Sequence, residues 1–273
     1  MKRIMVASAL AFCIALPAAP AKAGLFDDFF GWVKNTFSTV KKKRAKQKQQ
    51  TQQRTAVTAH EQRTIANQIM PSQYGSYNRS KECWGSNCMS VNFINRIRFT
   101  DGDIYYMLTA ASNEKTYDMF ALRHEAGHYR ILAKRHYQGM GFSGDGMFVQ
   151  LGRSAYGWNL MTGDKGGMSL YEDYYIFVDD EIKHVASIQD FSRSGVSNNG
   201  HVLSGDIQVG QGNGFFYPLE VKVTGLTHAR IACNSCEPRG GKRMSPKYYR
   251  FEYNKETGRY EMPAGYPMKG QRF

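Results

Sequence analysis

The chain has 273 residues, of which 42% are hydrophobic and 13% aromatic, and its formal net charge at pH 7 is +13. This length allows one large or two small domains, and the hydrophobic content is that of a globular protein, which excludes a wholly disordered chain. After residue 23 no apolar run approaches the length of a membrane-spanning helix, and the polar residues 265–273 carry no anchor signal.

Residues 1–23 have the pattern of a cleavable secretory signal. A positively charged start is followed by an apolar run that is too short to span a bilayer well, and then by Ala21-Lys22-Ala23. This tripeptide offers small residues at the two positions that a signal peptidase reads. We expect the mature chain to begin near Gly24 and to be exported to the periplasm or secreted.

Residues 24–70 are expected to form a separate helical segment that begins with an amphipathic helix. Between residues 25 and 40, apolar and aromatic side chains recur on one face with the helical period. An aromatic amphipathic helix followed by cations is typical of a segment that lies in a membrane interface. The alternative is a helix that docks on the protein's own core. The residues expected to bind a surface are the aromatic Phe26, Phe29, Phe30 and Trp32 and the cationic Lys41, Lys42, Lys43 and Arg44.

The positive charge is concentrated in this segment. Without residues 1–23 the net charge falls from +13 to +10, of which residues 24–54 supply +6 and residues 55–273 only +4. A local polycation indicates an anionic partner, here a membrane or cell-wall surface, and we do not expect nucleic acid. The alternative is a solvated, self-repelling linker. Residues 41–68 fit either a long solvated helix or a linker, and we expect Pro71 to end it.

Residues 71–273 are expected to form a mainly β domain. Short runs rich in β-branched and aromatic residues alternate with Gly-rich turns at a spacing of about ten residues. This pattern favours an antiparallel sandwich- or barrel-like domain, preceded by the amphipathic and basic helical segment. The predicted strands are 91–99, 104–108, 147–151, 174–178, 219–223, 248–253 and 259–262, the last two flanking a hairpin loop at 254–258.

Four cysteines remain after removal of the signal, namely Cys83, Cys88, Cys233 and Cys236. Four cysteines allow three pairings, and spacing alone does not choose among them. We favour two local disulfides, Cys83–Cys88 and Cys233–Cys236, because an oxidising compartment favours disulfides over a four-thiolate zinc site. A redox role for the second pair is disfavoured because its surroundings have the composition of a loop.

Residues 124–128 match the zinc-binding pattern HExxH. On a helix this spacing places His124 and His128 one turn apart, where both can bind zinc while Glu125 deprotonates the zinc-bound water. These five residues resemble the zinc motif of membrane-bound AAA-type metallopeptidases. The flanking residues instead predict the arms of a hairpin with a three-residue loop at 125–127 and the two histidines facing each other. Gly127 also weakens a helix at its centre.

The leading hypothesis is therefore an exported, non-enzymatic β-rich module whose N-terminal segment associates with the cell envelope. The expected partner is an anionic membrane, a cell-wall surface or another envelope protein, and no cofactor is expected. The alternative is a secreted zinc-dependent metallohydrolase with His124 and His128 as ligands and Glu125 as catalytic base.

Overall fold

The computed structural model describes residues 57–99, 102–112, 116–138, 142–143, 147–163, 168–212, 214–234 and 236–268. The expected signal peptide, the expected helix at 25–40 and the surface-binding residues from Phe26 to Arg44 lie outside the described residues.

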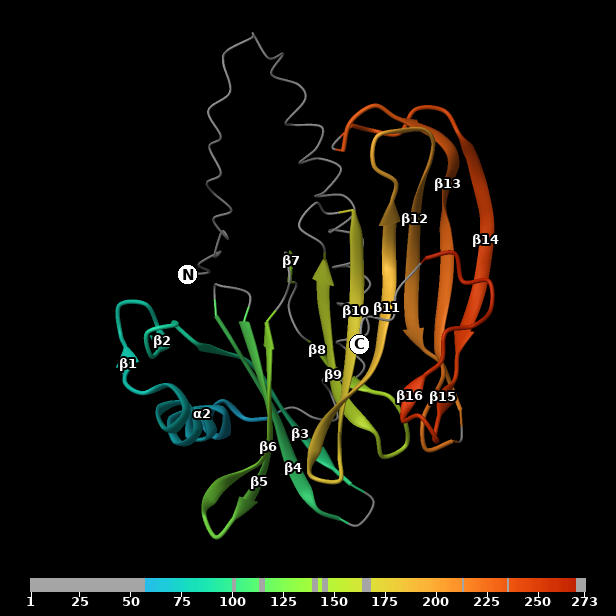
Figure 1. Ribbon diagram of the computed structural model, residues 1–273. Helices are drawn as coiled ribbons and strands as arrows, with labels where there is room; N and C mark the ends of the chain where they lie inside the picture. Colours follow the sequence, from blue (N-terminus) through green and yellow to red (C-terminus); the bar gives the residue numbers. More distant parts are fainter. Residues whose placement is uncertain are drawn as a thin grey trace, which may run out of the picture.

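The described chain is mostly β and antiparallel, as the sequence predicts, with one helix before the strands (Figure 1). The helix is α2 (Ala59–Tyr74). A four-stranded sheet has the order β3 (Ser90–Arg98), β4 (Ile104–Ala111), β5 (Thr116–Glu125) and β6 (His128–Gln138). An eight-stranded sheet has the order β14 (Lys242–Phe251), β13 (Leu219–Ile231), β12 (Ser197–Val209), β11 (Glu181–Arg193), β10 (Ser169–Val178) and β9 (Tyr156–Gly163), and both β7 (Phe142–Ser143) and β8 (Met147–Gln150) pair with β9. Two short hairpins are formed by β1 (Tyr77–Asn78) with β2 (Cys83–Trp84) and by β15 (Tyr253–Asn254) with β16 (Arg259–Tyr260).

These elements form layers, with α2 on one face of the small sheet and the large, curled sheet on the other (Figure 1). Ile65, Ile69 and Met70 of the helix are buried together with Leu108 and Phe120 of the small sheet. A second apolar cluster lies between the two sheets and joins β4 and β5 to β9 and β10. Its buried members include Trp158, Tyr175, Phe177, Met107 and Met119. The small sheet is therefore buried on both faces, which explains the nearly continuous apolar runs of β4 and β5.

Helix α2 begins at a capping box and runs past Pro71. The Thr58 side chain accepts a hydrogen bond from the Glu61 backbone N–H, and the Glu61 carboxylate accepts one from the Thr58 N–H. The expectation that Pro71 ends the helical segment is wrong, because the helix continues to Tyr74 and the N–H of Gly75 still bonds to the Pro71 carbonyl. Proline removes one helical donor, but tertiary packing of the preceding turn offsets that loss. The helix thus crosses the expected domain boundary at residue 71 and packs on the β-sheet.

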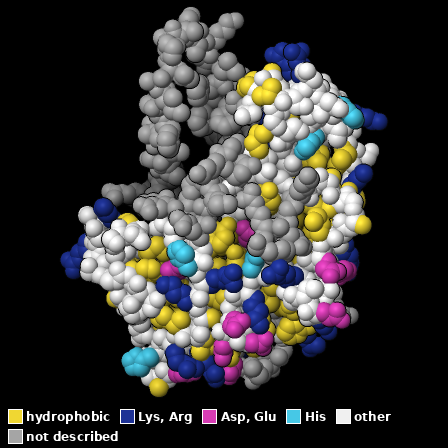
Figure 2. Space-filling model, in the orientation of Figure 1, with side chains coloured by type: hydrophobic (Ala, Val, Ile, Leu, Met, Phe, Trp, Pro, Cys, Tyr) yellow, Lys and Arg dark blue, Asp and Glu magenta, His cyan; other side chains and the backbone are white. Residues whose placement is uncertain are grey.

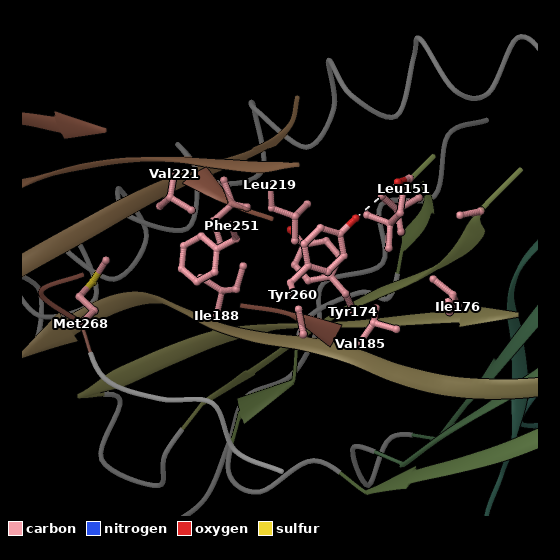
Figure 3. Packing of buried hydrophobic residues seen from close by; sticks show 14 of the residues in the cluster. Leu151, Tyr174, Ile176, Val185, Ile188, Leu219, Val221, Phe251, Tyr260 and Met268 are labelled. Atoms are coloured by element: carbon pink, nitrogen blue, oxygen red, sulfur yellow. Dashed lines mark hydrogen bonds between the residues drawn. The ribbon is translucent and has the colours of Figure 1, made fainter. Parts of the chain in front are cut away.

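The far face of the large sheet encloses a third apolar cluster, shown in Figure 3. Along β13 the residues Leu219, Val221 and Val223 point into it, whereas Glu220 and Lys222 between them are exposed. The C-terminal part of the chain covers the cluster with the buried side chains of Phe251, Tyr260 and Met268. The Tyr260 hydroxyl donates to the carbonyls of Tyr217 at 2.7 Å and Leu151 at 3.4 Å, so β16 is bonded to two distant segments.

Candidate anion-binding site

The HExxH residues lie in a β-hairpin and not in a helix. Strands β5 and β6 pair Glu125 with His128, so the loop consists of Ala126 and Gly127 alone. Their φ values of 49° and 84° are both positive, as in a two-residue type I′ turn. The expected three-residue loop with facing histidines is therefore wrong. Side chains alternate along a strand, so His124 lies on the opposite face of the hairpin from Glu125 and His128.

These side chains have local partners on the hairpin. The ring of His124 packs on Tyr129 with the centroids 4.7 Å apart. The Glu125 carboxylate forms ion pairs with Arg123 and Arg130 at 3.5 and 3.0 Å. In the part of the chain that the structure describes, no group of three or more His, Cys, Asp or Glu is placed to hold a metal ion. The helical geometry that would let two imidazoles share a zinc is not formed by these residues.

Both predicted disulfide pairings are confirmed. Cys83 lies at disulfide distance from Cys88, and Cys233 from Cys236. The two pairs are consistent with an oxidising, exported environment. No helix among the described residues is long and apolar enough to cross a membrane.

Two hairpin connections of the large sheet lie at one end, because antiparallel neighbours reverse direction at every connection. Residues 194–196 join β11 to β12, and residues 232–241 join β13 to β14 and contain the Cys233–Cys236 disulfide. Both lie at the upper end of the large sheet in Figure 1. Val196, at the first connection, is 67% exposed, so this end presents an apolar side chain to solvent.

At the same end, two arginines face each other directly. Arg230 and Arg239 form an isolated antiparallel bridge in which each backbone N–H donates to the other residue's carbonyl, at 3.0 and 2.9 Å. Directly opposite residues in such a pair project to the same face. Both side chains are exposed, and neither takes part in the ion pairs found among the described residues. Like charges directly opposite are destabilising, so this arrangement favours an anion.

Two further exposed cations, Lys242 and Arg243, begin β14 immediately after this loop. We call Arg230, Arg239, Lys242 and Arg243 the cationic end. Figure 2 shows Lys and Arg side chains at the upper end of the large sheet. The sequence did not reveal this site because the net charge of residues 55–273 was taken as a single sum. A local count would have found it, since residues 224–247 hold five Lys or Arg and a single acid, Glu237.

Arg193, on β11, is bonded to the loop that contains Arg239. This side chain is only 5% exposed, and its guanidinium donates hydrogen bonds to the carbonyls of Cys233 and Cys236. Burial lowers the pKa of Arg193 from its ordinary value, yet a guanidinium stays charged at neutral pH. The disulfide and the hydrogen bonds from Arg193 together fix the position of the loop.

His201 forms hydrogen bonds beside the connection between β11 and β12. Its Nδ1 lies 2.9 Å from the Ser194 hydroxyl and its Nε2 lies 3.1 Å from the Ser192 hydroxyl. Burial lowers the pKa of His201 below its ordinary 6.5, so the ring is neutral at pH 7. Opposite His201, β13 bulges with Thr227 and His228, and His228 has a φ of 56°. Bulges are common beside binding sites because they redirect side chains.

A second polar centre lies between α2 and the small sheet. The carboxylate of Asp118, 5% exposed, accepts hydrogen bonds from the Tyr74 hydroxyl at 2.5 Å and the Lys134 ammonium at 3.1 Å, and lies 2.6 Å from Nδ1 of His136. Burial alone would raise the pKa of Asp118, but these hydrogen bonds outweigh it and hold the pKa below its ordinary 3.8. Burial and the bond to Asp118 raise the pKa of the Tyr74 hydroxyl. This centre connects the helix to β5 and β6.

The cationic end therefore combines four exposed cations, a rigid disulfide loop and an exposed apolar residue, with no carboxylate paired to its facing arginines among the described residues. Such an arrangement can bind an anionic group at the end of the sheet. No protein-family profile matches the chain, and a search of curated proteins gives no match.

Proposed function

We propose that this protein is an exported, non-enzymatic β-rich module that binds an anionic phospholipid surface of the cell envelope. The observation that carries the proposal is the direct opposition of Arg230 and Arg239 without an acidic partner among the described residues. Exposed like charges at such short range indicate that their counter-charge comes from another molecule.

Two further features favour a lipid surface over a soluble anion. Val196 is exposed at the same end of the sheet as the cations, and an exposed apolar residue near positive charge suits the boundary between headgroups and acyl chains. The predicted signal at residues 1–23 would deliver the chain to the envelope, and the basic residues 24–54 would add a second contact. Two weak contacts on one chain bind together more tightly than either does alone.

The test is binding of the chain from residue 24 onward to phosphatidylcholine vesicles with and without phosphatidylglycerol. Binding should require the anionic lipid and should fall steeply between about 50 and 500 mM salt, because screening shortens the reach of surface charges. Deletion of residues 24–54 should abolish it. The double variant Arg230→Ala/Arg239→Ala should weaken it by about thirtyfold, since each of the two cations near an anionic surface contributes about 1 kcal/mol.

A matched control removes two exposed cations elsewhere. Arg79 and Lys81 lie in the turn between β1 and β2, and Arg79→Ala/Lys81→Ala lowers the net charge by the same amount. This variant should bind like the unaltered chain. Binding that does not change with salt concentration, or that weakens equally in both double variants, would contradict the role proposed for the cationic end.

A further inference from the structure

We infer that the group bound at the cationic end is a phosphate monoester, clamped between the guanidinium groups of Arg230 and Arg239. This inference rests on the proposed function and specifies the headgroup chemistry that the same site prefers. It follows from the number and placement of hydrogen-bond donors at this end of the sheet.

The donors are the fork-shaped guanidinium groups of two arginines whose backbones lie directly opposite each other. In a hydrogen-bonded antiparallel pair the Cα atoms lie about 5.5 Å apart and both side chains leave the same face, so one anion can contact both forks. Each fork prefers two acceptor oxygens. A carboxylate or a phosphodiester offers two free oxygens and one negative charge, which satisfies one of the two arginines. A phosphate monoester offers three free oxygens and a charge of about −1.5 to −2 at pH 7, which matches the pair.

The site is also preorganised. Arg239 is bonded through its backbone to Arg230 on β13, and the loop between them is closed by the Cys233–Cys236 disulfide. The buried Arg193 donates to two carbonyls of that loop, so the position of Arg239 depends little on the ligand. Lys242 follows on β14 and adds positive potential without a nearby acidic partner in the described chain. A rigid site loses less conformational entropy on binding, which favours selection by geometry over attraction by charge alone.

The experiment compares vesicles of equal surface charge that contain either phosphatidate, a monoester, or phosphatidylglycerol, a diester. Charge is matched by measured zeta potential, and the chain from residue 24 onward is used in each case. We expect several-fold tighter binding to phosphatidate, loss of this preference in Arg230→Ala/Arg239→Ala, and an unchanged preference in Arg79→Ala/Lys81→Ala. Circular dichroism of each variant confirms that the sheet is formed.

Equal binding to the two lipids at matched charge would overturn the inference, as would a preference that survives in Arg230→Ala/Arg239→Ala. Neither result touches the proposed function, which requires only that anionic vesicle binding depends on the arginine pair. Titration with inorganic phosphate distinguishes the source of the group. Direct binding of inorganic phosphate that needs both arginines assigns the site to a free phosphate group, whereas a phosphatidate preference without such binding assigns the site to the lipid headgroup. Both results support recognition of a phosphate with at least three free oxygens rather than a diester.

Discussion

Asp118 illustrates how a single buried charge joins two layers of this protein. Its carboxylate is almost fully buried and accepts hydrogen bonds from groups on α2 and on β6. A buried charge is costly unless it is paired and hydrogen-bonded, and here three neighbours satisfy it. We expect the centre to stabilise the contact between helix and sheet, and we assign it no chemistry.

Replacing Asp118 by Asn should therefore lower the free energy of unfolding by about 1–3 kcal/mol, because the donors around it lose their charged acceptor. The measurement is urea unfolding at pH 7. The control is Asp179→Asn, since Asp179 is 79% exposed and its ion pair with Lys183 spans 3.4 Å. An exposed pair contributes little, so this control should change stability by less than about 0.5 kcal/mol.

The difference in unfolding free energy between the unaltered chain and Asp118→Asn should depend on pH. The pKa of Asp118 is lower in the folded protein than its ordinary 3.8, so the unfolded chain binds this proton more readily. The stabilisation is present above about pH 4 and is lost as the pH falls through the folded pKa. The difference in stability between the native chain and Asp118→Asn should shrink between pH 5 and pH 2. An unchanged difference across that interval would show that the carboxylate charge is not what stabilises the contact.

At the scale of elements, the β5–β6 hairpin shows how backbone geometry decides the meaning of a motif. Ala126 occupies a left-handed position with a φ of 49°, where a residue with a Cβ is strained and Asn is favoured. Ala126→Asn should raise the free energy of unfolding by about 0.5–1 kcal/mol. Gly127→Ala should lower it by about 1 kcal/mol through backbone strain alone, because a Cβ at Gly127 would meet nothing within 4 Å. Opposite signs in thermal unfolding would confirm the turn type, whereas destabilisation by both changes would contradict it.

Local patterns predicted most of the elements. The alternation in 91–99 and 219–223 corresponds to β3 and to the start of β13. The loop predicted at 254–258 corresponds to residues 255–258 between β15 and β16, with Asn254 ending β15. Strands β11 and β12 escaped prediction because Ser, Asn, Gly and Asp interrupt their apolar pattern. Their strand conformation is set by pairing with neighbours, which a window along the chain does not contain.

The cationic end could be predicted only in part, for the same reason. Its charge density is visible in residues 224–247, and the local disulfide follows from cysteine spacing. The direct opposition of Arg230 and Arg239 depends on the register of the bridge between them. The hydrogen bonds that hold the loop come from Arg193, which lies on another strand. Contacts between distant segments require the assembled sheet.

For the whole molecule, the proposed export makes a direct prediction about the mature N-terminus. The chain recovered from the envelope fraction should begin at Gly24, because Ala21 and Ala23 fit the signal peptidase. Intact mass and N-terminal sequencing check this. Replacement of Ala23 by a large residue should leave the precursor uncut, and the conservative change Ala23→Gly should be processed normally. A mature protein that keeps Met1 would contradict export by this route.

The Tyr260 hydroxyl and the buried Met268 complete the interior of the large sheet from the last stretch of the described chain. If the chain passes through a translocation channel with its N-terminus first, strands β8 to β14 leave the channel before these residues do. Until then Leu151 and Leu219 lack part of the cover that they have in the folded protein. Under the proposed export, complete packing of the large sheet therefore requires residues at the C-terminal end of the described chain, which would leave the channel late.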